Sequence, residues 1–239
     1  MPNTYFQFKQ FTVQQEHTAM KVCTDACLFG AWVAQHLAHI TTEATRILDI
    51  GTGTGLLSLM VAQKTQAAID AVEIDTAAAL QAAANFRESS WKERLMVHQT
   101  AIQEFSNTRP YNFILSNPPF FENDLKSIDS KRNLALHSEA LSLEELLQAI
   151  QSRLTSNGQF AILLPYHRSS YFESLCSTKG FYTAENTSVR QTPTHAPFRS
   201  MLLFTTTETT TIHQEIIIKE QNHYTPSFTA LLKDYYLFI

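Results

Sequence analysis

The stretch that most constrains this chain is residues 46–57, RILDIGTGTGLL, where an apolar run breaks into three glycines on alternate positions. The apolar run is typical of a buried strand, and the residues after the glycines follow helical spacing. A strand, a glycine turn and a helix N-terminus together present backbone N–H groups to a ligand at the carboxyl end of a strand. Glycine permits such a turn because it has no Cβ. The stretch therefore predicts an α/β fold with a ligand site.

The spacing of the glycines indicates which ligand the turn binds. Dinucleotide sites space them G-x-G-x-x-G, whereas Gly51, Gly53 and Gly55 follow G-x-G-x-G. Asp49 precedes the turn, and an acid there suits a ligand with a cationic end, such as the amino group and sulfonium of S-adenosylmethionine. The stretch resembles motif I of the class I methyltransferases. An ordinary glycine-rich turn is the alternative, which only the rest of the chain can decide.

Apolar strands alternate with helical patterns along the chain, which predicts a mostly parallel sheet with helices on both faces. A period of two near the N-terminus indicates a short strand or hairpin. We expect six helices, over residues 24–34, 56–63, 76–88, 142–156 and 168–179 and from Ser227 onward. We expect seven strands in the sheet, over residues 47–50, 67–74, 95–98, 111–116, 159–164, 182–190 and 200–206, and a strand-like segment at 215–219.

Polar side chains end three of these strands. Asp49, Glu73 and Asn117 each stand at the carboxyl end of a predicted strand, where the sites of parallel sheets lie. An acid about twenty residues beyond the glycine turn can accept hydrogen bonds from both hydroxyls of a ribose, which is the role expected for Glu73. Asp75 is the alternative, although it fits better as a cap of the next helix. We expect the three strand ends to converge on one crevice.

The most specific signal in the chain is the motif Asn117-Pro118-Pro119-Phe120. Proline has no N–H, so two prolines end a strand abruptly. They direct the Asn117 side-chain oxygen and the Pro118 carbonyl to one place, and two convergent acceptors suit a planar NH₂ group. Accepting both hydrogens favours a rehybridised nitrogen that attacks a methyl group in line. Phe120 is suited to stacking on a flat substrate. A turn without chemistry is the other interpretation.

The glycine turn and the NPPF motif together resemble the amino-methyltransferases, which act on N6 of adenine, N4 of cytosine or N5 of glutamine. Two further stretches are similar to the bacterial tRNA1(Val) adenine-37 N6-methyltransferases. They are residues 21–32, KVCTDACLFGAW, and the end of the chain, from YTPS at 224–227 to YYLFI at 235–239. The pieces lie in the family's order and span nearly the whole chain. The chain therefore resembles this family of class I methyltransferases.

The resemblance implies an α/β, Rossmann-like single domain over residues 1–239, with a seven-stranded sheet. Residues 1–45 would form an extension packed over the cofactor site, and residues 46–239 the catalytic core. It also implies S-adenosyl-L-methionine as cofactor and adenine 37 of a valine tRNA as substrate. Phe120 replaces the commoner tyrosine of the motif, so stacking is kept and a phenolic hydrogen bond is lost.

By the same resemblance, Lys21, Thr24 and Asp25 would lie near the cofactor. The alternatives are that Thr24 is only a helix N-cap and that the other two form a solvated pair. Ala101 stands where such enzymes usually carry an acid for the adenine amino group, so either the backbone near Ile102 takes that contact or the adenine is held less tightly. The expected cofactor set is Lys21, Thr24, Asp25, Asp49, Gly51, Gly53, Gly55, Glu73, Ile102 and Asn117.

RNA contact must come from a local basic patch, because the net charge of −4 at pH 7 argues against binding nucleic acid by bulk charge. Taken singly, each basic residue is more often a solvated one; as a set near the crevice, they would hold phosphates of an anticodon stem-loop. The candidates are Lys9, then Lys126, Lys131, Arg132 and His137 in a polar segment, and Arg190, His195 and Arg199 around a loop.

Other classes of site are not indicated. The histidines lack ligand spacing, and Cys23 and Cys27 have no second pair, so no metal is assigned. No stretch reaches the roughly 18 apolar residues of a membrane helix. An odd number of cysteines fits free thiols in a reducing compartment, so we expect a cytoplasmic protein. The oligomeric state stays open, with a monomer as the default.

Three rival functions stay open. The first is methylation of a protein glutamine, although those enzymes place a separate helical domain before the methyltransferase fold and only residues 1–45 precede the first strand here. The second is a nucleotide-binding oxidoreductase, which the glycine spacing and the Pro-Pro strand end disfavour. The third is a catalytically silent RNA-binding module. On chemistry alone, adenine in DNA or ribosomal RNA is also a possible target.

Overall fold

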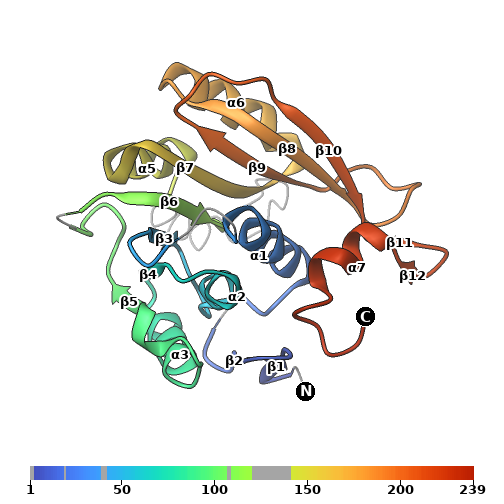
Figure 1. The fold of residues 1–239 in the computed structure, drawn as a ribbon, viewed down its shortest axis with the longest axis horizontal. Coiled ribbons are helices and arrows are strands. Elements are labelled where there is room, and N and C mark those ends of the chain that lie inside the picture. The colour runs from blue at the N-terminus through green and yellow to red at the C-terminus, as the bar shows by residue number, and fades with distance from the viewer. Residues whose placement is uncertain (1–2, 19, 39–41, 107–108, 120–140) are drawn as a thin grey trace, which may run out of the picture.

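A computed structural model describes residues 3–18, 20–38, 42–106, 109–119 and 141–239 (Figure 1). Within these residues the central sheet has eight strands in the order β10-β8-β9-β7-β6-β3-β4-β5. Only β9 runs antiparallel to its neighbours, so the expected mostly parallel sheet is confirmed. The strands are β3 (Arg46–Ile50), β4 (Ala68–Glu73), β5 (Leu95–Gln99), β6 (Tyr111–Ser116), β7 (Leu154–Pro165), β8 (Tyr182–Arg190), β9 (Arg199–Thr205) and β10 (Ile212–Ile217).

The predicted number of seven strands was one too few. β10 pairs in parallel with β8 at the edge of the sheet, with Ile212 opposite Glu185 and Ile217 opposite Arg190. Most of its residues are exposed and only Ile216 is buried. An edge strand with so few buried positions has little apolar pattern, so its place in the sheet follows from backbone pairing that the sequence does not display.

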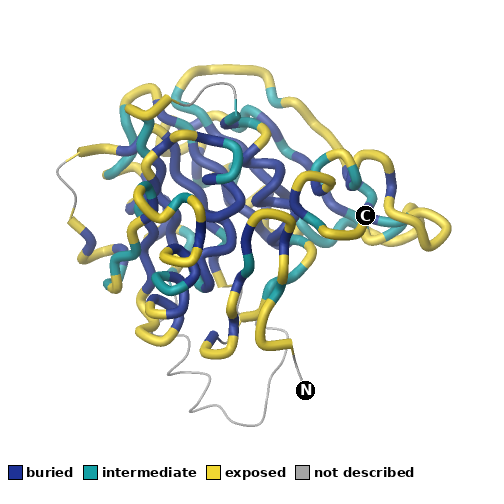
Figure 2. The backbone as a smooth tube through the Cα atoms, turned by 60° about the horizontal axis from the view of Figure 1, so that its bottom comes forward, coloured by how far each residue is buried: buried dark blue, intermediate teal, exposed yellow. Residues whose placement is uncertain are grey.

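Helices cover both faces of the sheet, as expected. Helices α1 (Thr24–Leu37), α2 (Leu56–Lys64), α3 (Thr76–Arg87) and α7 (Pro226–Leu232) bury side chains in a core on one face. Helices α5 (Leu143–Arg153) and α6 (Ser169–Thr178) bury theirs in a second core on the other face. Successive side chains of a strand point to opposite faces. The sheet therefore separates the two cores, and Figure 2 shows its buried strands surrounded by exposed loops.

The ends of several helices differ from the sequence expectations. Cys23, not Thr24, is the N-cap of α1, and Thr225, not Ser227, caps α7 by accepting the Phe228 N–H. Helix α5 ends at Arg153, and the chain continues at once into β7, where residues 154–159 form an irregular pairing with β6. Pairing with β6 thus ends the helix before residue 156, which is the end expected from the sequence. Helix α5 opens with a capping box, in which the Ser142 hydroxyl accepts the Glu145 N–H and the Glu145 carboxylate accepts the Ser142 N–H.

The N-terminal segment forms a hairpin of β1 (Tyr5–Gln7) and β2 (Thr12–Gln14), as the period of two predicts. The Asn85 side chain on α3 accepts the Gln14 N–H at 2.9 Å and donates to the Gln14 carbonyl at 2.9 Å. It also donates to the Thr54 carbonyl of the glycine turn at 2.9 Å. One side chain therefore ties the N-terminal segment to the turn.

Candidate active site

Strand register brings the three predicted strand ends together. Ile50 on β3 pairs with Val72 on β4 and with Ser116 on β6. The next residue along each of these three parallel strands is Gly51, Glu73 or Asn117. The three residues therefore lie at the same level at the carboxyl ends of the strands. Two further bonds fix the edge: the Gly51 N–H donates to the Val72 carbonyl at 2.9 Å, and the Ser116 hydroxyl donates to the Ile50 carbonyl at 2.9 Å.

The glycine turn adopts a backbone that other residues rarely reach. Gly51, Gly53 and Gly55 have φ angles of +72°, +57° and +81°. A Cβ at Gly55 would also lie 2.5 Å from the ring of Phe86, which is buried against the turn. Alternating left-handed residues open the turn, and Gly55 then leads into the N-terminus of α2. The backbone N–H groups of such a turn are suited to binding a ligand.

Asp49 lies beneath the turn and is fully buried. Its Oδ2 accepts hydrogen bonds from the Thr52 and Ser58 hydroxyls, both at 2.7 Å. Its Oδ1 has no hydrogen-bond partner among the described residues. Burial raises the pKa of this carboxyl to about 6, although the two hydroxyls act in the opposite direction. A buried carboxylate with one unused oxygen is suited to a cationic group.

Glu73, the last residue of the neighbouring strand β4, is hydrogen-bonded to the glycine turn. Its Oε2 accepts the Gly53 N–H at 2.8 Å, and its Oε1 accepts the Asp75 N–H at 2.9 Å. Each carboxylate oxygen keeps capacity for a further hydrogen bond, so ribose hydroxyls remain acceptable ligands. Asp75 instead caps α3, since its carboxylate accepts the Ala78 N–H at 2.8 Å. The cap interpretation of Asp75 is therefore confirmed.

The start of α1 lies at the same edge of the sheet. Asp25 accepts a hydrogen bond from Arg199 Nε at 2.8 Å, and both side chains are largely shielded from solvent. Arg199 begins β9 and pairs with Pro165 at the carboxyl end of β7. Lys21 donates to the Gln15 carbonyl, and Thr24 is exposed. A residue predicted to bind cofactor and a residue predicted to bind RNA thus form an ion pair.

Comparison with known proteins assigns the chain to a family. The model of the Methyltransferase small domain matches residues 31–177. A tRNA1(Val) (adenine(37)-N6)-methyltransferase of Dyadobacter fermentans is 42% identical, over 98% of this chain and 98% of its own. A protein of the same name from Bacteroides fragilis is 39% identical over 99% of each chain.

The chain belongs to the tRNA1(Val) (adenine(37)-N6)-methyltransferase family. A solved structure, that of a predicted O-methyltransferase from Agrobacterium tumefaciens, matches with a TM-score of 0.65 at 16% identity, over 88% of this chain and 96% of that one. The fold is the Rossmann-like fold of the class I methyltransferases, as the glycine turn predicts.

The remaining residues predicted for this methyltransferase lie in different places. Asn117 is half-buried, Pro118 is buried and Pro119 is exposed. The carbonyl of Ile102, a buried residue, accepts Arg153 Nη2 at 2.7 Å, so it is held by the protein itself. Phe120, Lys126, Lys131, Arg132 and His137 lie outside the described residues.

The predicted RNA contacts that lie within the described residues are found in two separate places. Arg190 ends β8 at the carboxyl edge, where it binds Glu215 at 2.7 Å and the His195 carbonyl at 2.8 Å. Lys9 instead donates to the Lys233 carbonyl at 2.6 Å. The neighbouring Asp234 forms an ion pair with the last residue of α2, so Lys9 lies near the end of that helix remote from the glycine turn. The structure therefore does not bring Lys9 to Arg190 or Arg199.

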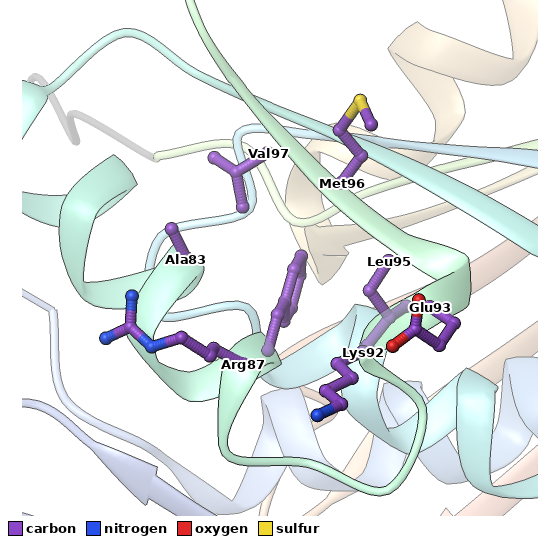
Figure 3. A pocket seen from close by; sticks show the side chains of 8 residues that line it. Ala83, Arg87, Lys92, Glu93, Leu95, Met96 and Val97 are labelled. Atoms are coloured by element: carbon purple, nitrogen blue, oxygen red, sulfur yellow. The ribbon is translucent and has the colours of Figure 1, made fainter.

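Three further kinds of feature would bear on function: a pocket, a metal site and a membrane-spanning helix. A pocket between α3 and the edge strand β5, lined by residues such as Ala83, Arg87 and Val97, contains none of the predicted site residues (Figure 3). Among the described ranges, no three His, Cys, Asp or Glu side chains gather as a metal would require. The described helices include none with the length and apolar character needed to cross a membrane.

Proposed function

We propose that this chain transfers a methyl group from S-adenosylmethionine to the exocyclic N6 of adenine 37 in tRNA1(Val). One observation carries this proposal. The carboxyl ends of three adjacent strands lie at the same level of the sheet, and they present Gly51, Glu73 and Asn117. In this proposal the glycine turn binds the cofactor, and the acceptors of Asn117 and Pro118 bind the target amine beside it. Membership of the family supplies the expected target.

The residues present fit the cofactor. S-adenosylmethionine supplies an electrophilic methyl group when bound, and its methionine end carries a cationic amino group. Asp49 offers a buried carboxylate oxygen beneath the turn that no described residue contacts, which favours a cation there. Glu73 would accept the ribose hydroxyls while it keeps the turn in place. Lys21, Thr24, Asp25 and the backbone at Ile102 complete the proposed cofactor set.

The target amine would be held by this chain's own acceptors. The Asn117 side-chain oxygen and the Pro118 carbonyl each accept one N6 hydrogen, which favours a nitrogen lone pair free for attack on the methyl group. A strong base is unnecessary, because the proton becomes acidic once the nitrogen is methylated and then leaves to water. In this proposal Phe120 stacks on the adenine.

The anticodon stem-loop would approach along the carboxyl edge. Arg190 and Arg199 lie at that edge, whereas Lys9 does not, so the two arginines are the proposed phosphate contacts. The substrate also implies a cytoplasmic enzyme, and we expect it to act as a monomer.

A mass-spectrometric assay tests the proposal. Unmodified tRNA1(Val) transcript is incubated with the purified chain and S-adenosylmethionine, digested to nucleosides and compared with an untreated sample. We expect up to one N6-methyladenosine per transcript, and none in a control transcript with guanosine at position 37. No gain in N6-methyladenosine, or an equal gain in the control, would overturn the assigned target.

A further inference from the structure

One half of the sheet extends farther than the other at the carboxyl edge. β6 ends at Ser116, which pairs with Ile162, whereas β7 continues to Pro165. Tyr166 then follows three residues beyond the level of Asn117 and one strand to the side. At about 3.3 Å per residue, it stands roughly 10 Å above Asn117 along the strand direction. The residues after β7 therefore rise beside the proposed amine site.

Aromatic and cationic side chains occupy this raised position. Tyr166 and Tyr171 are 45% and 47% exposed, whereas most aromatic residues of the described chain are buried. The Arg168 guanidinium lies 5.5 Å from the centre of the Tyr171 ring. The Tyr171 hydroxyl donates to Glu144, the acid that faces this surface from α5, so that carboxylate is already engaged. We call Tyr166, Arg168 and Tyr171 the ledge.

The backbone of the ledge is held in place by the surrounding fold. The Tyr166 N–H donates to the Phe198 carbonyl at 3.1 Å, which connects the ledge to the loop before β9. The Ser169 hydroxyl donates to the Tyr166 carbonyl at 2.7 Å and is buried. A fixed backbone beneath exposed side chains lowers the entropy lost on binding a ligand.

We infer that the ledge binds an unstacked nucleotide of single-stranded RNA next to the target base. An exposed tyrosine ring offers a face on which any base can stack, and a guanidinium suits the adjoining phosphate. Flipping the target adenine unstacks its neighbours, which then need new partners. None of the ledge residues takes part in the proposed cofactor or amine contacts. This inference rests on the proposed function, because it takes the RNA to enter at Asn117.

Binding of a fluorescent RNA stem-loop with the anticodon-arm sequence of tRNA1(Val) tests the ledge. Tyr166→Ala is expected to raise the Kd for RNA about tenfold or more. Tyr166→Phe is expected to keep the wild-type Kd, because the ring on which the base stacks is retained. Arg168→Ala is expected to reduce the salt dependence of log Kd by about one phosphate contact. The affinity for S-adenosylhomocysteine should stay unchanged in all three variants.

Matched controls come from the rest of the surface. Tyr182 is 38% exposed and begins β8 at the opposite edge of the sheet, and Arg87 is exposed on α3. Tyr182→Ala and Arg87→Ala should leave the Kd for RNA unchanged. Wild-type affinity in Tyr166→Ala and Arg168→Ala would overturn the ledge even where the wild type methylates tRNA. Conversely, weaker RNA binding by these variants in a chain that transfers no methyl group would support the ledge and overturn the proposed function.

Discussion

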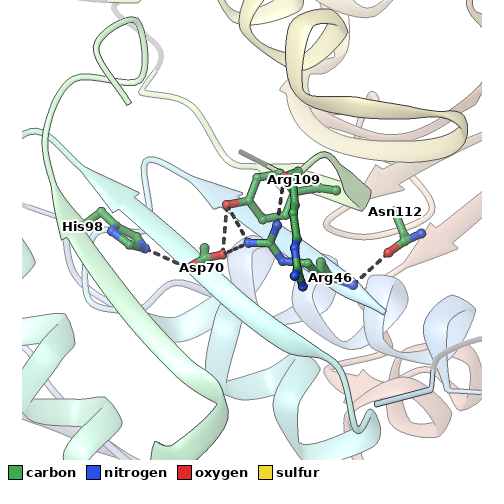
Figure 4. Close-up of polar contacts among 6 residues, drawn as sticks. Arg46, Asp70, His98, Arg109 and Asn112 are labelled. Atoms are coloured by element: carbon green, nitrogen blue, oxygen red, sulfur yellow. Dashed lines mark hydrogen bonds and ion pairs between the residues drawn. The ribbon is translucent and has the colours of Figure 1, made fainter. Parts of the chain in front are cut away.

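Two carboxylates on neighbouring strands differ in the hydrogen-bond and ion-pair partners that the protein gives them. Asp49 on β3 and Asp70 on β4 lie one residue level apart and point to opposite faces of the sheet. Asp70 accepts hydrogen bonds from Arg46 at 2.7 Å, Tyr111 at 2.9 Å and His98 at 2.7 Å (Figure 4). Asp49 receives two hydroxyls on one oxygen and, from the described residues, neither a cation nor a partner on the other oxygen.

The difference separates a carboxylate that stabilises the fold from one that is available to a ligand. A buried charge is costly unless it is paired and hydrogen-bonded. The protein satisfies Asp70 with its own arginine, whose guanidinium also lies 4.6 Å from the centre of the Tyr111 ring. It leaves Asp49 with the cost of burial, at the edge where the glycine turn opens. The comparison predicts that substitutions at the two places change different quantities.

The largest expected effect is at the carboxyl edge. Asn117→Ala removes one acceptor of the proposed amine site, so kcat should fall by about 10²–10³-fold, as when one hydrogen-bonding group is removed from a catalytic site. Asn117 is half-buried, and the free energy of unfolding should change by less than about 0.5 kcal/mol. Methyl-transfer kinetics and chemical denaturation measure the two quantities. Near wild-type kcat would remove Asn117 from the mechanism.

The reverse pattern is expected at Asp70. Asp70→Asn removes the negative charge that pairs with Arg46, so the free energy of unfolding should fall by about 3 kcal/mol. The Kd for S-adenosylhomocysteine should stay within about twofold, as an effect within ±0.5 kcal/mol implies. Glu88→Gln, at an acid with a 79% exposed side chain, is the matched control and should change neither quantity. Loss of ligand affinity in Asp70→Asn would break the comparison.

Asp49 should affect how the free energy of unfolding depends on pH. Its native pKa of about 6 lies above the ordinary value, so the native state holds a proton that the unfolded state has lost. The contribution of Asp49 to the free energy of unfolding therefore falls as the pH rises, by about 2 kcal/mol between pH 4 and pH 6. Denaturation of wild type and Asp49→Asn across this range isolates the difference, since the other acids are shared. Parallel stability curves for the two proteins would contradict the assigned burial cost.

The smallest expected effect is at Glu73. Glu73→Gln replaces one acceptor oxygen by an NH₂ group, so one of its two bonds to a backbone N–H is lost. The free energy of unfolding should fall by about 1.5 kcal/mol, because the lost bond joins a backbone N–H to a charged carboxylate. The Kd for S-adenosylhomocysteine should rise about tenfold, because the lost bond contributes roughly 1.5 kcal/mol, the low end for a hydrogen bond to a charged group. Calorimetric titration would contradict the ribose role if the affinity did not change.

Much of the fold follows from signals that are local in the chain. The glycine turn, the strands before and after it and the strand ended by two prolines are encoded within a few residues, because backbone conformation depends on near neighbours. Strand β6 and strand β8 have the predicted bounds. The predicted boundary was wrong at the end of α5, where strand pairing ends the helix early. Strand β10 was not counted in the sheet because an exposed edge strand shows little pattern.

The sequence by itself determined which residues stand at strand ends and what chemistry those residue types permit. The three strand ends come together as the sequence predicts, but only the tertiary structure decided which other side chains contact one another. The ion pair of Asp25 with Arg199 joins residues separated by 174 positions, and Lys9 is held beside the far end of α2. The unused oxygen of Asp49 and the bracing of the turn by Glu73 also depend on neighbouring strands and helices. Partners of this kind are set by packing across the whole chain, and no local pattern encodes them.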